Sequence, residues 1–417
     1  MRGYKELGRI DEAHCLRGWS RAIALVCCLS LVVGLVACAG GNSNPSASGL
    51  PQPTQEPTKT PNKALIPSLS SMASPEEGIQ EFLWGSSNVN RDLKLAKDAG
   101  FKWVKQMFQW NHIEKEGKGK FEWNEPDRLV GAAEKNEVKM LARVDFTPMW
   151  ARPQGADPKL DGPPADYNDF GDFLTALATR YKGRIQAYQI WNEPNLARDW
   201  GGQTPNAADY VRLLKIAHTA IKAADPQAIV ITAGLAPTTA SGAIATPDMD
   251  YLQQMYDAGA KPYFDMLGVH GAGYRAPPEA DPGTVARDPV MTNNDPSPEK
   301  AKRIYAFRHV EDMRKIMVQN GDEAKRVAIL EFGWTSDPRP NSPYHWFAVS
   351  EEQKAKYIVG AFDYARKQWQ PWVGIMSLIY ISAPYWTQED EQYYWSITDP
   401  KGSPRPSYDA VKAMLKN

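Results

Sequence analysis

Short apolar runs and helical patterns alternate eight times along the chain, and this repetition constrains the fold more than any other feature. Most of the runs are rich in Val, Ile and Leu without polar alternation, a pattern typical of strands buried on both faces. The runs span 82–85, 103–108, 138–144, 185–191, 228–235, 264–270, 327–332 and 373–380. Amphipathic helices are predicted near 90–99, 125–136, 170–181, 210–221, 248–258, 298–319, 351–369 and 406–415.

The repeated strand-then-helix order predicts parallel strands joined by right-handed crossovers. Eight such units in about 340 residues are typical of a (β/α)8 TIM barrel in the α/β class. A doubly wound open sheet is the alternative fold, but neither GxGxxG nor GxxxxGK[ST] follows the first run, which excludes its commonest nucleotide-binding versions. In a barrel, functional residues are expected at the carboxyl ends of the strands. The longer loops, expected to form the walls of a cleft there, are 151–166, 271–297, 335–349 and 381–400.

The first residues have the composition of a targeting segment. Arg17 and Arg21 precede an apolar run over 22–37, which is shorter than the roughly 20 residues that a bilayer-spanning helix needs, so a cleaved signal is favoured over a permanent span. The sequence Leu-Val-Ala-Cys ending at Cys38 resembles the lipobox of bacterial lipoproteins, which implies lipidation of Cys38. The predicted organisation is a lipoprotein signal peptide over 1–37, the lipidated Cys and a flexible tether over 38–75, and a single folded domain over 76–417. We therefore expect an extracytoplasmic protein, anchored to the cell membrane or cell surface through this lipid alone.

Composition excludes several classes of function. The formal net charge is −1, so the chain has no basic surplus for nucleic acid. All four cysteines lie at or before Cys38, which excludes a catalytic Cys, an iron–sulfur site and a Cys-rich zinc site from the folded domain. No HxxxH spacing occurs among the six His, and we expect neither a metal site nor a cofactor. The 14 Trp suit both a large core and stacking on sugar rings.

Two glutamates stand at the ends of predicted strands. Glu193 follows the fourth run and Glu331 ends the seventh, so both are expected at the same mouth of a barrel. A carboxylate directly after an apolar strand is costly unless it is paired, hydrogen-bonded or needed for chemistry. Two carboxylates across a barrel mouth supply what glycoside hydrolysis needs, which is a proton donor and a base or nucleophile at the anomeric carbon.

The sequence Trp-Asn-Glu-Pro-Asn around Glu193, followed by Leu-Glu-Phe-Gly-Trp around Glu331, resembles the clan A retaining glycoside hydrolases with (β/α)8 barrels. With Leu196 and Trp200 it is most similar to glycoside hydrolase family 39, the β-xylosidase and α-iduronidase family. The segments 108–114 and 119–123 are similar to the segment after strand two in several families of this clan. The resemblance implies that Glu193 is the acid/base and Glu331 the nucleophile of a double displacement. Glu193 is expected to have a raised pKa and Glu331 to stay ionised.

Further residues are candidates for substrate binding. The resemblance implies that Asn192 binds the sugar 2-hydroxyl and that His270 and Tyr274 touch the nucleophile or the substrate. Trp150, Trp334 and Trp386 follow predicted strands and are candidates for stacking on pyranose rings, with plain packing as the alternative. Arg143 and Lys105 lie inside predicted strands, where each is either a site residue or a member of a structural ion pair.

These observations favour a retaining β-glycoside hydrolase that acts without cofactor on plant or microbial oligosaccharides or polysaccharides, as a β-xylosidase-like enzyme or an endo-β-glycanase. The alternative is a non-catalytic surface lipoprotein that binds carbohydrate for a transporter, because a lipobox and tether are also the layout of solute-binding proteins. The sequence indicates neither the exact sugar nor the oligomeric state.

Overall fold

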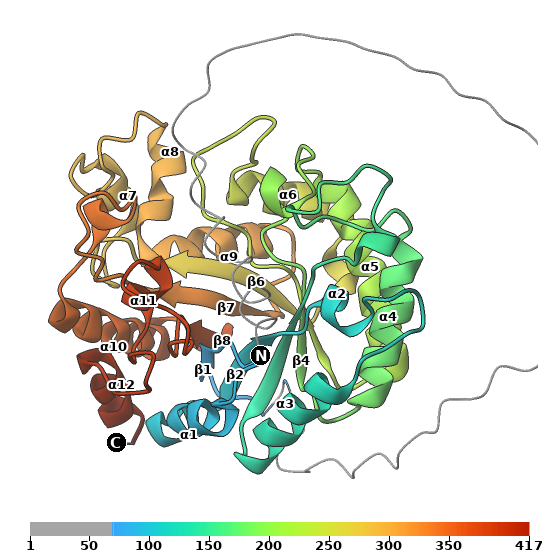
Figure 1. Cartoon of the computed structure of the whole chain (residues 1–417). Helices are drawn as coiled ribbons and strands as arrows, with labels where there is room; N and C mark the ends of the chain where they lie inside the picture. Colours follow the sequence, from blue (N-terminus) through green and yellow to red (C-terminus); the bar gives the residue numbers. More distant parts are fainter. Residues whose placement is uncertain (1–68, 70, 417) are drawn as a thin grey trace, which may run out of the picture. The chain divides into compact units, whose positions relative to one another are not determined.

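The computed structural model describes residue 69 and residues 71–416, and within them eight parallel strands close into a barrel in sequence order, with β1 hydrogen-bonded to β8 (Figure 1). This confirms the predicted (β/α)8 fold. The strands are β1 (Glu76–Gln80), β2 (Trp103–Met107), β3 (Lys139–Val144), β4 (Ala187–Ile190), β5 (Ile229–Ile231), β6 (Met266–Ala272), β7 (Arg326–Gly333) and β8 (Val373–Leu378).

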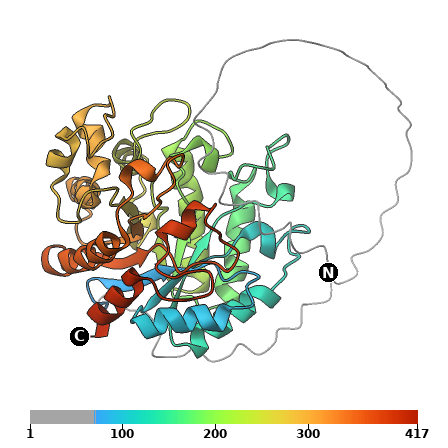
Figure 2. The same ribbon diagram turned by 60° about the vertical axis from the view of Figure 1, so that its left-hand side comes forward.

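Helices surround the strands, and short additional helices lie in the loops (Figure 1). In both views the C-terminal helix α12 lies beside α1, so the two ends of the barrel sequence pack together (Figure 2). The helices are α1 (Val89–Ala99), α2 (Trp110–Ile113), α3 (Asn124–Lys135), α4 (Tyr167–Arg180), α5 (Ala207–Ala224), α6 (Asp248–Asp257), α7 (Pro282–Arg287), α8 (Glu299–Lys302), α9 (Val310–Gln319), α10 (Glu351–Gln368), α11 (Glu391–Trp395) and α12 (Pro406–Lys416).

The barrel interior is apolar at one level and polar at the next. The apolar cluster is made of Met72, Trp103, Leu141, Ala187, Ile229, Ile231, Met266, Ala328, Leu330 and Ile375. Two residues further along β2 and β3, on the same face of each strand, stand Lys105 and Arg143. Because the lower level is filled with apolar side chains, the polar chemistry is confined to the carboxyl ends of the strands.

The first strand differs from the sequence prediction. The apolar run 82–85 follows β1 rather than forming it, and Phe82 packs in a small cluster with Ala383 and Trp386. The strand β1 contains only one large apolar residue, Ile79, because polar contacts hold it in place: Glu76 accepts a hydrogen bond of 2.6 Å from Trp103 Nε1 and pairs with Lys139. A search for apolar runs therefore missed it.

Two other predicted elements also differ. The helix predicted over 298–319 is broken at Ala306, whose backbone is extended (φ −117°, ψ 139°), so that α8 and α9 are separate helices joined by short 3-10 turns. The strand predicted over 228–235 ends at Ile231, and Leu235 makes only an isolated bridge with Val269.

The N-terminal predictions concern residues outside the described part of the chain. The signal peptide, Cys38 and most of the tether lie there. Among the helices that the structure does describe, none combines the length and apolar character needed to cross a membrane.

One buried histidine links two helices. His309 lies 2.8 Å (Nε2) from Asp248 at the start of α6 and 3.1 Å (Nδ1) from Asp312 in α9. Burial alone would lower the pKa of His309, but the charge of Asp248 and the hydrogen bonds to both carboxylates outweigh burial and raise the pKa to about 9. His309 is thus an imidazolium between two carboxylates at neutral pH.

This arrangement predicts a stability that depends on pH. The folded-state pKa lies above the unfolded value near 6.5, so the stabilisation is fully present below about pH 6.5 and is lost as the pH rises towards 9. The free energy of unfolding of wild type and of His309→Gln can be measured in urea at about pH 6 and at about pH 9.5. The substitution should lower this free energy at both pH values, and the loss should be smaller at about pH 9.5 by on the order of 3 kcal/mol. The matched control is His218→Gln in α5, where partial burial lowers the pKa instead of raising it, so the effect of this substitution should not shrink as the pH rises from about 6 to about 9.5. Equal losses at both pH values for His309→Gln would contradict the prediction.

Candidate active site

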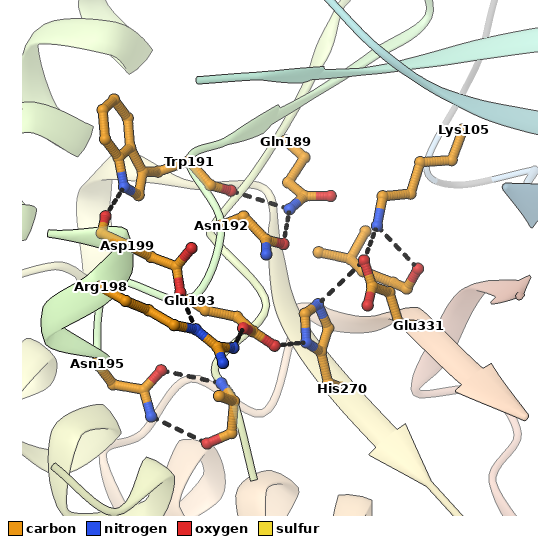
Figure 3. Close-up of polar contacts among 12 residues, drawn as sticks. Lys105, Gln189, Trp191, Asn192, Glu193, Asn195, Arg198, Asp199, His270 and Glu331 are labelled. Carbon is orange, nitrogen blue, oxygen red and sulfur yellow. Dashed lines mark hydrogen bonds and ion pairs between the residues drawn. The ribbon is translucent and has the colours of Figure 1, made fainter. Parts of the chain in front are cut away.

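The turn after β4 carries Glu193 in an uncommon backbone conformation. Trp191 and Glu193 both have positive φ angles, +70° and +46°, which side chains other than Gly rarely adopt. Two hydrogen bonds support the turn: the Glu193 amide donates to the Gly234 carbonyl at 3.0 Å, and Trp191 Nε1 donates to the Asp199 carbonyl at 2.8 Å. The strained turn is therefore held by the loop after β5 and by a later part of its own loop, and it directs the Glu193 side chain across the barrel mouth (Figure 3).

Asn195, the last residue of the Trp-Asn-Glu-Pro-Asn sequence, is completely buried. Its side chain accepts a hydrogen bond from the Ala236 amide and donates to the carbonyls of Ala236 and Thr246. The loop after β4 is thereby tied to the loop after β5. Sequence reasoning gave no role to this residue, although its place in the motif was the available signal.

Glu331 reaches the mouth because β7 contains a bulge. The register with β6 shifts so that Val269 pairs with Ile329 but His270 pairs with Glu331. Leu330 is the extra residue, and it lies in the apolar cluster inside the barrel while Glu331, its neighbour, also contacts interior residues. A bulge allows two successive side chains to point the same way, which a regular strand forbids.

His270 stands between the two glutamates (Figure 3). Its Nδ1 lies 3.1 Å from Glu193 Oε1, and its Nε2 lies 3.9 Å from Glu331 Oε1. A Cβ atom at Gly234 would lie 2.2 Å from His270 Nε2, so only glycine leaves room for the ring there. One oxygen of Glu193 lies within 4.8 Å of one oxygen of Glu331. The two predicted carboxylates and the predicted histidine are thus brought together.

Lys105 binds Glu331 directly. Its Nζ lies 2.8 Å from Glu331 Oε1 and donates to the Leu330 carbonyl at 3.2 Å, and its side chain is almost completely buried. Burial works against ionisation of Glu331, but Lys105, with smaller contributions from His270 and Arg143, outweighs burial and lowers the pKa of Glu331. Glu331 is therefore ionised at neutral pH, as expected for a nucleophile.

The electrostatic environment of Glu193 contradicts the expectation. Burial raises the pKa of Glu193, but the hydrogen bond with His270 and the charge of Arg198 outweigh burial and lower the pKa to about 2. Arg198 Nη2 lies 2.8 Å from Glu193 Oε2. The prediction of a raised pKa was wrong for this structure, because the hydrogen bond with His270 and the charge of Arg198, five residues along the chain, both favour the ionised form of Glu193.

Asn192 lies beside Glu193 and is held by Gln189. The Asn192 Oδ1 accepts a hydrogen bond of 3.1 Å from Gln189 Nε2, which also donates to the Trp191 carbonyl at 2.9 Å. This bond uses the amide oxygen, so the amide nitrogen of Asn192 is the group oriented to donate elsewhere. Gln189 is a positioning residue that the sequence did not indicate.

Arg143 forms an ion pair with Asp145 at 2.5 Å, at the end of β3. The charge of Arg143 also lowers the pKa of Glu331 and works against the raised pKa of Asp199, so Arg143 lies close to the site. Arg143 thus forms a structural ion pair, and that ion pair lies at the site.

Tyr274 follows β6 with a positive φ of 49°. Its ring contacts those of Tyr305 and Phe347 at centroid distances of 4.8 and 5.1 Å, and Trp346 lies at 6.0 Å. Burial raises the pKa of the Tyr274 hydroxyl, and the negative charges of Asp248 and Glu193 add to this effect. Tyr274 thus belongs to an aromatic cluster that lies near Glu193.

The three predicted stacking tryptophans are largely engaged in packing. Trp334 is completely buried, donates to the Ala276 carbonyl at 3.0 Å and covers Gly273, so stacking on a sugar ring was wrong for Trp334 and the packing alternative holds. Trp386 is 6% exposed and packs edge-on against Phe82. Trp150 is half-buried, and its Nε1 donates to the Glu114 carbonyl at 2.7 Å.

The site favours acid–base and nucleophilic chemistry over metal binding. Lys105 and Arg198 already neutralise the two glutamates as cations, so the chemistry of the group does not fit a metal ion. Within the described residues, the site consists of carboxylates with cationic, imidazole and amide neighbours at the carboxyl ends of the strands (Figure 3).

No family model matches this sequence, and no curated protein matches it either. The structure, however, resembles solved barrels. It is similar to a family 39 glycoside hydrolase from the gut symbiont Bacteroides cellulosilyticus (19% identity, TM-score 0.59, covering 82% of this chain and 64% of that one). It is also similar to a family 39 β-xylosidase from Caulobacter crescentus (20%, 0.54, 82% and 72%). A third is xylanase 10B from Thermotoga petrophila in complex with xylobiose (15%, 0.52, 86% and 98%). The chain thus spans slightly less than two thirds of the first of these proteins, and the shared property is the (β/α)8 fold.

Proposed function

We propose that this chain is a retaining β-glycoside hydrolase in which Glu331 is the nucleophile and Glu193 the acid/base. The observation that carries the proposal is the approach of the two carboxylates to within 4.8 Å. Retaining enzymes hold their carboxyl groups roughly 5 Å apart, whereas inverting enzymes need about 6.5 to 9.5 Å to admit a water molecule. The fold shared with known glycoside hydrolases gives independent support.

In the proposed reaction Glu331 acts as a carboxylate and Glu193 acts first in its protonated form. Glu331, kept ionised by Lys105, attacks the anomeric carbon while Glu193 gives a proton to the departing oxygen. In the second step Glu193 takes a proton from water, and the water oxygen displaces Glu331 from the sugar. Protons balance over the two steps, because Glu193 takes one proton from water in place of the one that it gave to the leaving group.

Three neighbours of the glutamates have roles in this scheme. The amide nitrogen of Asn192, oriented by Gln189, would donate to the sugar 2-hydroxyl, a hydrogen bond that strengthens in the transition state. His270, between the glutamates, keeps Glu193 and Glu331 in a fixed relation. Tyr274 would present its hydroxyl from the adjacent aromatic cluster.

We infer β-xylosides or related β-linked plant or microbial glycans as the substrate class, because two similar structures are described as a β-xylosidase and a xylanase. Both exo and endo action fit this inference. We further propose that the protein acts outside the cytoplasm, anchored through a lipid on Cys38.

The binding-only alternative is less well supported. A sugar-binding protein has no need for two carboxylates within reach of one anomeric carbon, each held by its own cation. It would also have no need for the strained turn at Glu193.

The full-length chain should be assayed against a panel of aryl β-glycosides and polysaccharides, with sugar binding measured in parallel by calorimetry. The proposal predicts hydrolysis of at least one β-glycoside by wild type. Binding of a sugar without hydrolysis of its β-glycosides or polymers would favour the transport-related alternative.

A further inference from the structure

Arg198 bridges two carboxylates at the mouth of the barrel (Figure 3). Its Nη2 lies 2.8 Å from Glu193 Oε2 and its Nε lies 2.9 Å from Asp199 Oδ2. Arg198 and Asp199 belong to a single 3-10 turn (Ala197–Asp199), which the Trp191 indole holds through the Asp199 carbonyl. The guanidinium therefore already contacts a second carboxylate besides Glu193.

In this arrangement Glu193 is prepared to act as a base rather than as an acid. Its Oε1 is hydrogen-bonded to His270, and its Oε2 accepts from Arg198. A guanidinium only donates hydrogen bonds, so Glu193 Oε2 and Asp199 Oδ2 both accept from Arg198, and the second oxygen of Glu193 is held by His270. A general acid instead needs a proton on an oxygen that faces the leaving group.

Asp199 has the complementary character. Burial raises the pKa of Asp199 to about 7, and the negative charge of Glu193 contributes while Arg198 opposes it. Glu193, with its pKa near 2, is the ionised member of the pair. The proton that Glu193 lacks in this structure is thus available on its neighbour near neutral pH.

We propose that Arg198 is a positioning residue that switches Glu193 between its base and acid forms by moving between Glu193 and Asp199. The inference rests on the proposed function. When Arg198 moves fully onto Asp199, Asp199 loses one proton and Glu193 gains one, while the guanidinium keeps its charge. The net charge of the site is unchanged. Return of Arg198 to Glu193 after the leaving group departs favours the carboxylate that takes a proton from water.

Arg198 is the most exposed of the three cations near the two glutamates. Its side chain is 34% exposed, whereas those of Lys105 and Arg143 are 1% and 11% exposed. Lys105 is bound to Glu331 and Arg143 to Asp145, so each already serves another carboxylate.

Charged and titratable groups from several elements face this switch. Around Glu193 they are His270 on β6, Glu331 on β7, Tyr274 after β6 and Arg198 itself. Around Asp199 and Arg198 they are Arg143 on β3 and Glu391 on α11. Of these, His270 is confined by Gly234, and Arg198 is the group that contacts Glu193 and Asp199 together.

The test is the pH dependence of kcat/KM with a β-glycoside that has a poor leaving group. Arg198→Gln should shift the basic limb of this pH profile to higher pH by about one unit or more, because ionised Glu193 loses its cation and its pKa rises. Asp199→Asn should move the same limb downward, because Arg198 then has no second carboxylate in its turn and stays on Glu193. Arg198→Lys should restore part of the wild-type profile. Asp199→Asn made in the Arg198→Gln background should leave the limb where Arg198→Gln alone puts it, because Asp199 acts through Arg198 in the switch. A direct effect of the Asp199 charge on Glu193 would still move the limb to lower pH in this background and would contradict the switch.

A second readout uses a dinitrophenyl glycoside, for which the second step limits kcat. Here Arg198→Gln should move the acidic limb of kcat upward by about one pH unit, because Glu193 is less readily ionised as the base. The matched control is Arg180→Gln, which removes an ion pair with Asp127 from a side chain of similar exposure, 31%, outside the barrel mouth. It should leave both limbs in place.

Limbs that stay unmoved in both Arg198→Gln and Asp199→Asn, in an otherwise active retaining enzyme, would overturn the switch and leave the proposed function intact. Wild-type protein without hydrolysis, or with inversion, would instead overturn the proposed function. Thermal melting checks that the variants fold. If Arg198→Gln does not fold, Arg198→Lys and Asp199→Asn decide the question. An unmoved basic limb in Asp199→Asn is by itself enough to contradict the switch.

Discussion

Replacement of Glu331 by Gln is expected to lower kcat/KM by roughly 10⁴-fold or more, because the amide cannot attack the anomeric carbon. Steady-state kinetics with an aryl β-glycoside measure this loss. Sugar binding should persist, since the introduced amide would keep the shape of the side chain and lose only its charge. Hydrolysis at the wild-type rate would remove Glu331 from the nucleophile role.

The chain offers a matched control for this variant. Glu76 is another glutamate at the barrel that is paired with a lysine, Lys139, but it lies at the opposite end of the strands. Glu76→Gln should lower stability and leave kcat/KM near the wild-type value at temperatures below unfolding. Azide adds a chemical check: with Glu331→Ala it should restore turnover and give a glycosyl azide of inverted configuration, because azide then attacks from the side that Glu331 left.

Replacement of Glu193 by Gln should give a loss that depends on the leaving group. For sugar or alkyl leaving groups, which need a proton, kcat/KM should fall by about 10² to 10⁴-fold. For a dinitrophenyl group, which departs without a proton, kcat/KM should change little, while kcat falls because no base activates water. A burst of dinitrophenolate, followed by slow turnover, is the expected signature in stopped-flow absorbance.

Azide distinguishes this residue from the nucleophile. With Glu193→Ala it should accelerate breakdown of the glycosyl-enzyme and give an azide of retained configuration. An equal loss for good and poor leaving groups would contradict the role of Glu193 as acid/base.

The barrel was predictable from sequence because parallel strands buried on both faces produce continuous apolar runs. β1 was the exception, since Glu76 and Glu77 are held by ion pairs with Lys139 and Arg366 rather than by apolar packing. Ion pairs between distant residues leave no periodic signal in the sequence.

The two glutamates were predictable from their positions at strand ends, but their environments were not. The bulge that turns Glu331 inward comes from the register with β6. The low pKa of Glu193 depends on the path of the 3-10 turn that brings Arg198 back to it. Trp334 was misplaced for a similar reason, because its burial depends on Gly273 and on the Tyr357 ring of α10 beneath it.

The most direct measurement is the anomeric configuration of the first product, followed by proton NMR while wild-type protein hydrolyses a β-glycoside. The separation of Glu193 and Glu331 predicts that the β-anomer appears first and converts to the α-anomer only by mutarotation. Initial appearance of the α-anomer would show inversion and would contradict the assignment of Glu331 as nucleophile.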